Sequence, residues 1–409
     1  MATEARRDLG EIQILDPDVY VRGRPYEQWA TLRAQAPVYW HDAFHGYPAQ
    51  WMVTRYNDIV TVSRQPTVFV SSLGITAGNR PDVPDPAANT MMITTDPPRH
   101  VRLRRLVNKG FTPRAINALE SHVRRIVTEI LDSVQDREQC DFVTEVSSIL
   151  PLAVICDMMG VPQPDWPKMF AWTNMTLGAE DPEYQTEGAT AEQTGLQARM
   201  SMFQYFAGMA AQRHQEHKDD LLGTLLEADI DGERLTDEEV LYFCFLLIVA
   251  GNETTRNATT GGLLALFEHP EQRERLQDDL ALLPTAIEEI LRWTSPVTHM
   301  SRTATQDAEV GGQLIRAGEK LTMWYPSANR DEEIFPNPDT FDITRSPNEH
   351  IAFGIGEHFC LGASLARLEL RVMFEELLQR LPNIRPSGPP ELLRSNFIGG
   401  IKHLPVRLR

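Results

Sequence analysis

The amino-acid sequence predicts a mainly α-helical protein with small peripheral β-sheets. Between residues 97 and 292, apolar residues recur almost without a break at helical spacing. Period-two alternation, which is typical of strands, is confined to short segments near residues 38–54 and 302–325. Length alone favours two or three domains, but no linker, low-complexity tract or internal repeat divides the 409 residues. We therefore expect one domain over residues 1–409, with residues 1–20 as a poorly ordered N-terminal arm.

The N-terminal part of the chain is predicted to combine helices with one hairpin. The expected elements are a helix over residues 24–36, hairpin strands over Val38–Trp40 and Gln50–Thr54, and a helix capped by Asn57 and Asp58 that ends at Arg64. Residues 71–90 are rich in glycine and proline, so a long irregular loop follows. We expect this loop, extended to residue 95, to be mobile.

The helical half is predicted to break at Phe111–Pro113 and at a polar connection over residues 178–190 that also looks mobile. Its longest element covers residues 236–268 and begins with Thr236 and Glu239 at the spacing of a capping box. The centre of this helix is apolar on every side, so it should run through the core. Residues 302–325 then alternate as strands, and the tail from Asn396 to Arg409 is predicted to form a final hairpin.

Composition excludes several classes of function. The formal net charge is −18, which opposes binding to nucleic acid or to anionic membranes. The four cysteines have no C-x-x-C spacing, so neither a zinc motif nor a disulfide framework is expected, and a reducing cytoplasm suits them. The longest apolar run, Tyr242–Ala250, is too short to span a membrane, and no leader pattern precedes it. We expect a cytoplasmic protein without a membrane anchor.

The segment Phe353–Ala363 contains the strongest motif of the chain. Its sequence places Cys360 in a glycine-rich turn, directly before an amphipathic helix. Glycines there permit tight turns and a close backbone approach to a flat ligand. Amide dipoles at a helix N-terminus favour the thiolate form of a cysteine, which is a ligand for soft metals and haem iron. A lone cysteine is more often an apolar core residue, but here a phenylalanine, glycines and a histidine stand around it.

The pattern F-G-x-G-x-H-x-C-x-G resembles the haem-binding loop of the cytochrome P450 family. The resemblance implies a cytochrome P450 fold and Cys360 as the axial ligand of iron in haem b (iron protoporphyrin IX). It also implies cofactor contacts from Phe353, Gly354 and Gly362.

Ala250–Thr255, in the middle of the long helix, forms a second motif. The Thr254 hydroxyl can bond back to the Ala250 carbonyl and open a groove. Glu253 stands beside this hydroxyl, and an acid with an alcohol can relay protons. The segment resembles the family's (A/G)-G-x-(D/E)-T pattern, which implies catalytic roles for Thr254 and Glu253 and a cofactor contact from Ala250. The alternative is a simple crossing of helices through small residues.

Cations at four positions match the family's partners of the two haem propionates, which need charged or polar donors. His100 and Arg104 share one helical face, and Arg302 and His358 fall at two further family positions. The remaining cations of the same region are expected on the cysteine-side surface, where an acidic electron-transfer protein could dock: Arg102, Arg105, Lys109 and Arg114.

Glu289 and Arg292 resemble the family's E-x-x-R motif, whose ions are internal and structural. The usual third partner is an arginine in P-x-R-F, but this chain has Thr340 at that position. Arg330 is our candidate replacement.

The segments that line the family's substrate site are mostly apolar in this sequence, which favours a lipophilic ligand. The candidate pocket residues are Leu73, Met91, Met92, Ile93, Leu246, Val249, Ala250, Val297, Thr298, Met300, Phe397 and Ile398. Residues 395–402 look like the branch that acts on steroids, terpenoids and branched or fatty-acid-like lipids.

These resemblances predict a bacterial haem-thiolate monooxygenase that inserts one atom of O2 into a C–H bond. No flavin or dinucleotide fingerprint is seen, so electrons should come from a separate ferredoxin or flavodoxin with an NAD(P)H reductase. We expect a monomer. Three alternatives stay open: a peroxide-driven peroxygenase or isomerase of the same fold, a non-catalytic haem sensor or lipid-binding protein, and a helical protein without haem.

Overall fold

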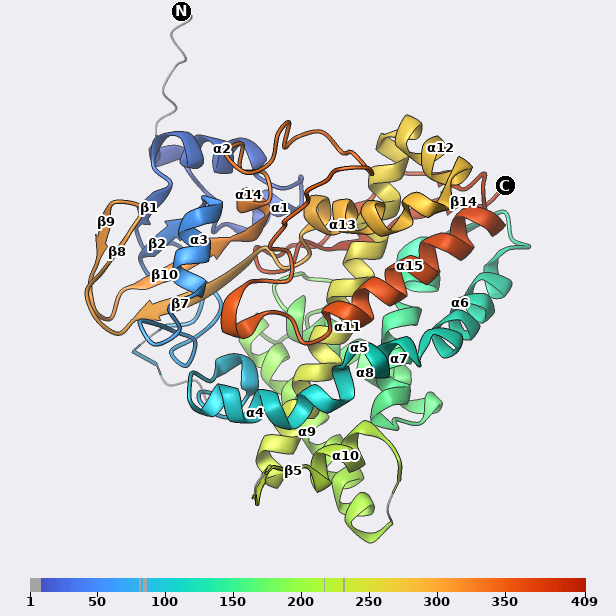
Figure 1. Ribbon diagram of the computed structural model, residues 1–409, viewed down its shortest axis with the longest axis horizontal. Helices are drawn as coiled ribbons and strands as arrows, with labels where there is room; N and C mark the ends of the chain where they lie inside the picture. Colours follow the sequence, from blue (N-terminus) through green and yellow to red (C-terminus); the bar gives the residue numbers. More distant parts are fainter. Residues whose placement is uncertain (1–8, 81, 84–86, 217, 231) are drawn as a thin grey trace, which may run out of the picture.

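The computed structural model describes residues 9–80, 82–83, 87–216, 218–230 and 232–409. Helices fill most of it, and β1, β2 and β7 to β10 lie together at one side, whereas β5 and β14 lie elsewhere (Figure 1). The helices are α1 Pro17–Tyr20, α2 Tyr26–Gln35, α3 Tyr56–Ser63, α4 Arg99–Val107, α5 Pro113–Asn117, α6 Glu120–Val134, α7 Ile149–Met159, α8 Trp166–Leu177, α9 Ala191–Gln215, α10 Leu221–Glu227, α11 Asp237–Glu268, α12 Pro270–Asp278, α13 Leu283–Thr294, α14 Tyr325–Ala328 and α15 Ala363–Arg380. The predicted mainly α-helical class is confirmed.

The strands form one larger sheet and several small ones. The larger sheet is five-stranded, in the order β1-β2-β10-β7-β3. Its β1 and β2 pair antiparallel, as the predicted hairpin requires. The strands are β1 Val38–His41, β2 Gln50–Val53, β3 Phe69–Val70, β4 Gln139–Asp141, β5 Asp229–Ile230, β6 Glu233–Arg234, β7 His299–Ala304, β8 Ala308–Val310, β9 Gln313–Ile315, β10 Lys320–Trp324, β11 Arg385–Pro386, β12 Glu391–Leu392, β13 Ile401–His403 and β14 Pro405–Arg407.

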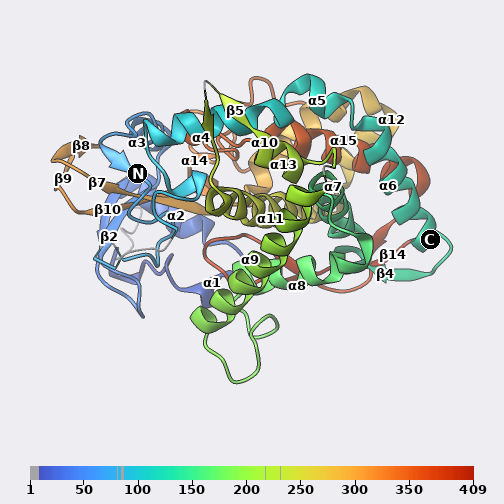
Figure 2. The ribbon, with the colours of Figure 1, turned by 90° about the horizontal axis from the view of Figure 1, so that it is seen from below.

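Helix α11 runs through the core of the molecule. It contains 32 residues, which corresponds to about 48 Å at 1.5 Å per residue. The Thr236 hydroxyl accepts from the Glu239 amide at 3.2 Å, and the Glu239 carboxylate accepts from the Thr236 amide at 2.9 Å, so the predicted capping box is present. Helices α7, α8, α9, α13 and α15 pack around α11 (Figure 2), which explains why its centre is apolar on all sides.

Three local predictions are wrong. The arm expected over residues 1–20 is packed from residue 9 onward, because Ile14 and Leu15 are buried in a cluster with Trp29; residues 1–8 lie outside the described part. The C-terminal hairpin does not form: β13 pairs with β12, and β14 pairs with β11 and β4. Only Leu404 separates β13 from β14, too few residues for a hairpin turn.

The third error concerns the cap of α3, and the helix itself is present. Helix α3 begins at Tyr56, after Arg55, and its first turn has no side-chain cap from Asn57 or Asp58.

Among the described residues, no helix has both the length and the apolar character needed to cross a bilayer.

The two segments expected to be mobile are tied to neighbouring elements. In the first, Ile75 O accepts from the Ser301 amide at 2.7 Å and Thr76 O accepts from Nζ of Lys320 at 2.6 Å. In the second, the buried Asp181 accepts from the Arg394 amide at 2.9 Å and from Nζ of Lys402 at 3.1 Å.

Candidate active site

An internal cavity lies where α4, α11 and α15 meet the loop before α15. Its volume is about 230 Å³. Most of its wall is apolar, and its basic side chains come from α4, β7 and the loop of residues 352–362. The wall consists of Met92, Ile93, His100, Arg104, Phe111, Ile155, Leu246, Leu247, Ala250, Gly251, Thr254, Thr255, Ala258, Leu291, Pro296, Val297, Met300, Arg302, Tyr325, Ala352, Phe353, Gly354, Ile355, His358, Cys360, Leu361, Gly362, Leu365, Ala366 and Glu369.

The loop that presents Cys360 is shaped by its backbone. The Cys360 amide donates to Phe353 O at 2.9 Å and closes the loop. Gly354 and Gly356 have φ values of +70° and +77°, which a side chain disfavours. A Cβ on Gly356 would also lie 2.5 Å from Ser63 O. The glycine pattern therefore lets the loop fold back against α3 and hold Cys360 at the cavity wall.

The environment of the Cys360 sulfur contains opposing influences. Burial raises the pKa of the thiol, while the Gly362 amide and the positive charges of Arg104 and Arg367 lower it. Arg367 is fixed by Glu288, which it contacts at 2.7 Å through both Nε and Nη2. The donor and the two cations are placed to stabilise a thiolate once a metal replaces the proton.

Four cationic or basic side chains line one end of the cavity. His100 and Arg104 come from α4, Arg302 from β7 and His358 from the cysteine loop. His100 is 1% exposed, and neither ring nitrogen has a hydrogen-bond partner. Nδ1 of His100 approaches the Glu357 carboxylate only to 3.8 Å, beyond hydrogen-bond distance.

The same end of the cavity has an excess of positive potential. Arg302 is buried, and its Nη1 donates to the neighbouring Ser301 carbonyl at 2.7 Å. Burial, with Arg302, His100 and Arg104 nearby, lowers the pKa of His358 to about 2. Burial also lowers the pKa of Arg104 and of Arg302. This cluster is arranged to accept anionic groups of a ligand.

Helix α11 forms another part of the cavity wall. Oγ1 of Thr254 donates to Ala250 O at 2.9 Å, which is the back-bond predicted from the sequence. Ala250, Gly251 and Thr254 all line the cavity. A Cβ on Gly251 would meet the Ile155 side chain at 3.4 Å, so this glycine also permits a close approach to α7.

Glu253 points away from the cavity, which the sequence interpretation did not foresee. It is 1% exposed and absent from the cavity wall. One carboxylate oxygen forms a short ion pair with Nη2 of Arg256, and Nη1 of Arg256 donates to Asn174 of α8 at 2.8 Å. Oε1 of Glu253 has no partner, and burial raises the pKa of this carboxyl.

A comparison with family models decides what this arrangement is. The model of the cytochrome P450 family matches residues 51–392. The chain belongs to the cytochrome P450 family. Its mainly α-helical fold is the P450 fold, and P450 enzymes are haem-thiolate monooxygenases.

Curated and solved P450 proteins are similar over nearly the whole chain. A methyl-branched lipid omega-hydroxylase of Mycobacterium tuberculosis is 44% identical and aligns with 98% of this chain and 94% of its own length. A steroid C26-monooxygenase of Rhodococcus jostii is 42% identical, with 96% and 83% covered. A P450 of Mycobacterium marinum, solved in complex with pseudoionone, has a TM-score of 0.89 and 38% identity, with 95% and 96% covered.

The cavity residues fit the haem that the P450 family implies. The unpartnered nitrogens of His100 and the buried guanidinium of Arg302 suit the two propionates of haem. Cys360 and Thr254 both line this cavity, and Phe353, Gly354 and Gly362 line it as well.

The P450 E-x-x-R pair is buried and has a third partner other than the predicted one. Arg292 contacts Glu289 at 2.8 Å, and both side chains are 0% exposed. Nε of Arg345 lies 3.1 Å from the same carboxylate. The candidate Arg330 is wrong: its guanidinium lies over the Tyr26 and Trp293 rings at 3.9 and 4.0 Å and forms its ion pair with Asp339 at 2.7 Å.

The pocket prediction divides into two groups. Half of the candidates line the cavity: Met92, Ile93, Leu246, Ala250, Val297 and Met300. The others do not: Leu73, Met91, Val249, Thr298, Phe397 and Ile398. Leu73 is exposed and Thr298 is fully buried. Phe397 packs against His299, and Ile398 bridges to Val297 behind the wall.

Sequence reasoning missed three side chains, two of which left a signal. Arg256 stands three residues after Glu253, the same spacing as Glu289 and Arg292, so an internal ion pair could have been predicted. Glu369 interrupts the apolar face of α15 that contains Leu365, four residues before it, which marks a buried acid. Arg345 had no comparable signal, because the loop that brings it to Glu289 is irregular.

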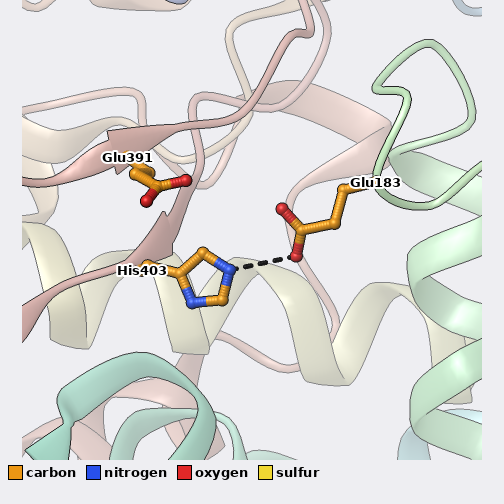
Figure 3. Close-up of side chains that lie close together, drawn as sticks. All are labelled: Glu183, Glu391 and His403. Atoms are coloured by element: carbon orange, nitrogen blue, oxygen red, sulfur yellow. Dashed lines mark hydrogen bonds and ion pairs between the residues drawn. The ribbon is translucent and has the colours of Figure 1, made fainter.

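Outside the cavity, the carboxylates of Glu183 and Glu391 lie close to the His403 imidazole (Figure 3). Nε2 of His403 is 3.0 Å from Glu183, and Nδ1 contacts Asp141. Nζ of Lys402 already lies 2.8 Å from Glu183 and supplies positive charge to it. We interpret this cluster as an ionic tether between the α8–α9 connection and the C-terminal strands.

Proposed function

We propose that this P450 binds haem b through the Cys360 thiolate and hydroxylates an unactivated C–H bond of a lipid-like molecule. The observation that carries the proposal is the composition of the cavity wall: a cysteine sulfur, the Thr254 groove of α11, and four basic side chains at one end, of which His100 has no hydrogen-bond partner. When bound, haem supplies the activation of O2, so that one oxygen atom enters the substrate and the other leaves as water.

The protein's own residues have separate tasks in this proposal. His100, Arg104, Arg302 and His358 hold the propionates. The Thr254 hydroxyl donates a proton toward the reacting oxygen. It then gives up its hydrogen bond to Ala250 O, and a water molecule from solvent donates to that carbonyl instead. Glu253 acts through Thr254 as a second proton-holding group, and it can do so only after leaving Arg256. The apolar wall excludes bulk water from the reaction.

A steroid, a terpenoid or a branched or fatty-acid-like lipid is the substrate class we propose. The wall above the haem site is formed by Met92, Ile93, Leu246, Val297 and Met300, and burial of apolar surface stabilises a lipophilic ligand by about 25 cal/mol per Å². The similar omega-hydroxylase and steroid monooxygenase support this class. No ionised side chain stands among these five residues to bind a charged substrate group.

Electron supply from a ferredoxin or flavodoxin with an NAD(P)H reductase follows from the same proposal, and so does a monomer working in the cytoplasm. The support for the cytoplasm is the dependence on NAD(P)H and the four free cysteines. Arg105 and Arg114 are exposed and are proposed docking residues. Nε of Arg102 lies 2.8 Å from Glu233. The side chain of Lys109 lies outside the described part. Reversal to R105E and R114E should slow reduction and flatten its salt dependence; an unchanged rate would remove the docking surface.

Isotope labelling separates the proposal from its alternatives. With NAD(P)H, a ferredoxin system and ¹⁸O2, a monooxygenase gives product containing one labelled atom and releases the other as labelled water. A peroxygenase gives labelled product from labelled peroxide without NAD(P)H. A haem sensor or lipid-binding protein gives a spectral change on binding and no product under either condition, which would overturn the proposed activity.

A further inference from the structure

Glu239, in the first turn of α11, is a buried carboxylate with partners on two elements. It is 3% exposed. Oε2 accepts from the Thr236 amide at 2.9 Å and completes the capping box of α11. Oε1 accepts from Nη2 of Arg99 at 2.8 Å and from Nη1 of Arg102 at 3.2 Å. One side chain therefore joins the beginning of α11 to α4.

The partners of Glu239 stabilise its charge inside the protein. Burial opposes this charge, but the Thr236 amide and the guanidinium groups of Arg102 and Arg99 together lower the pKa of the carboxyl. Nε of Arg102 also lies 2.8 Å from Glu233 of β6, the strand that precedes α11. Both contacts of the Arg102 guanidinium therefore lead to the segment that begins α11.

Helix α4 carries two pairs of basic side chains that point in different directions. Arg99 and Arg102 reach the start of α11, whereas His100 and Arg104 line the cavity. One helical turn has 3.6 residues, so the two pairs lie on different faces of the same nine-residue helix. A rotation of α4 that lengthened the contacts of the first pair would also move the second pair.

The packing of α4 leaves its rotation to be fixed by directional contacts. Among the described elements, α4 packs mainly against its chain neighbours, the short helical turns Met92–Thr94 and Asn108–Phe111. Its side chains Leu103, Leu106 and Val107 are buried in the core. Apolar burial is non-directional, so it holds α4 in place without fixing which way the helix is turned.

The cavity-facing pair takes its direction from α4. His100 has no hydrogen-bond partner at either ring nitrogen. Nε of Arg104 donates to Oδ1 of Asn108 at 3.2 Å, and Asn108 directly follows α4 in the chain. These contacts do not tie the pair to another helix. The ion pairs of Glu239 do, because they join α4 to α11.

We propose that Glu239 is a positioning residue of the haem site, which fixes the orientation of α4 so that His100 and Arg104 reach the two propionates. The inference rests on the proposed function, because it assumes the propionate contacts of these two side chains. Glu239 is not among the residues of the cavity wall, so it acts through α4. Loss of its charge should weaken the propionate contacts and leave the Cys360 ligand in place.

The first test reads the propionates spectroscopically. E239Q keeps an oxygen that can accept from the Thr236 amide but removes the charge that holds the two arginines of α4. In the resonance Raman spectrum of the ferric protein, the propionate bending band responds to hydrogen bonds at the propionates, and it should shift in E239Q in the same direction as in H100A. The control is E238Q, which removes an exposed acid of the same turn and should leave the band in place. An unshifted band in E239Q would overturn the inference.

The second test measures the rate of haem loss to a scavenging globin. E239Q should lose haem about threefold to tenfold faster than wild type, a smaller change than in H100A, because hydrogen bonds to the propionates are weakened and not removed. T236A isolates the capping role: it removes the hydroxyl that accepts from the Glu239 amide at 3.2 Å, and it should lower stability without changing haem loss. Equal haem loss in E239Q and wild type, or equal acceleration in T236A and E239Q, would overturn the inference.

A double variant separates positioning from general destabilisation. If Glu239 acts through the cavity-facing pair, E239Q should accelerate haem loss less in the H100A background than in the wild-type background. An acceleration equal to the product of the two single effects would contradict the inference. R102Q withdraws one cation from Glu239 and should reproduce part of the Raman shift, so it replaces E239Q if that variant does not fold.

Failure of the proposed function has a different signature. A wild type that binds no haem, or that forms no product, defeats the proposed function whatever Glu239 does. Hydrogen–deuterium exchange at the amides of Arg99–Val107 needs neither haem nor turnover, and it should rise in E239Q but not in T236A. Exchange in E239Q equal to that of wild type would remove the role of Glu239 alone.

Discussion

The Glu289 carboxylate should be the charged group whose loss destabilises this fold most. It accepts from Arg292 through Nη2 and Nε, both at 2.8 Å, from Nε of Arg345 at 3.1 Å, from Asn348 at 3.1 Å and from the Asp342 amide at 2.9 Å. Glu289 and Arg292 are both 0% exposed. The variant E289Q keeps the shape and removes the charge, so the Arg292 guanidinium is left buried without its counter-ion.

Breaking one partner of a buried pair costs about 3–5 kcal/mol, a large part of the 5–15 kcal/mol typical of a folded protein. Urea unfolding followed by tryptophan fluorescence measures the change. The matched control is E129Q, which breaks the exposed Arg125–Glu129 pair of 2.7 Å and should cost only about 0.3–0.5 kcal/mol. If the two variants shift the unfolding free energy equally, the role of Glu289 as an internal brace is refuted.

Three other predictions test the site and its surroundings. T254A should consume NAD(P)H with little product while T254S retains coupling, because only serine keeps the hydroxyl that bonds Ala250; equal product yield in both would contradict this. H100A should lose haem to a scavenging globin about 10–100-fold faster than wild type, since a hydrogen bond to a charged group contributes about 1.5–3 kcal/mol; unchanged loss would remove His100 from the propionate site. Burial lowers the pKa of Lys320 to about 7, so the unfolded chain binds more protons than the folded chain between about pH 7 and 10. The free energy of unfolding should therefore rise with pH over this range in wild type relative to K320M. Identical pH profiles of the two unfolding free energies would refute this prediction.

The sequence predicted those parts of the fold that depend on local chemistry. The α11 capping box, the β1–β2 hairpin and the back-bond of Thr254 each follow from a few neighbouring residues, and all are present. The tail was predicted wrongly because β13 and β14 join different sheets through partners far away in the chain. Hairpin signals cannot distinguish a strand's neighbour in sequence from a distant partner of similar character.

In the candidate site, too, features set by neighbouring residues were predicted correctly, and features set by distant residues were not. The positions of Cys360 and of the four basic residues at the cavity follow from motif spacing. The rotamer of Glu253 depends on Arg256 and on Asn174 of another helix, so spacing alone could not give its direction. The third partner of Glu289 comes from an irregular loop, where neither period nor capping constrains which arginine turns inward.

The central claim is that Cys360 binds haem iron as a thiolate, and one spectrum tests it directly. The purified protein, reduced with dithionite under carbon monoxide, should give a strongly red-shifted Soret band. C360H offers iron a neutral ligand instead and should move this band to the position of an ordinary haem–CO complex. A wild-type protein that is folded and haem-loaded but gives the ordinary band would contradict thiolate ligation, and with it the proposed oxygen chemistry.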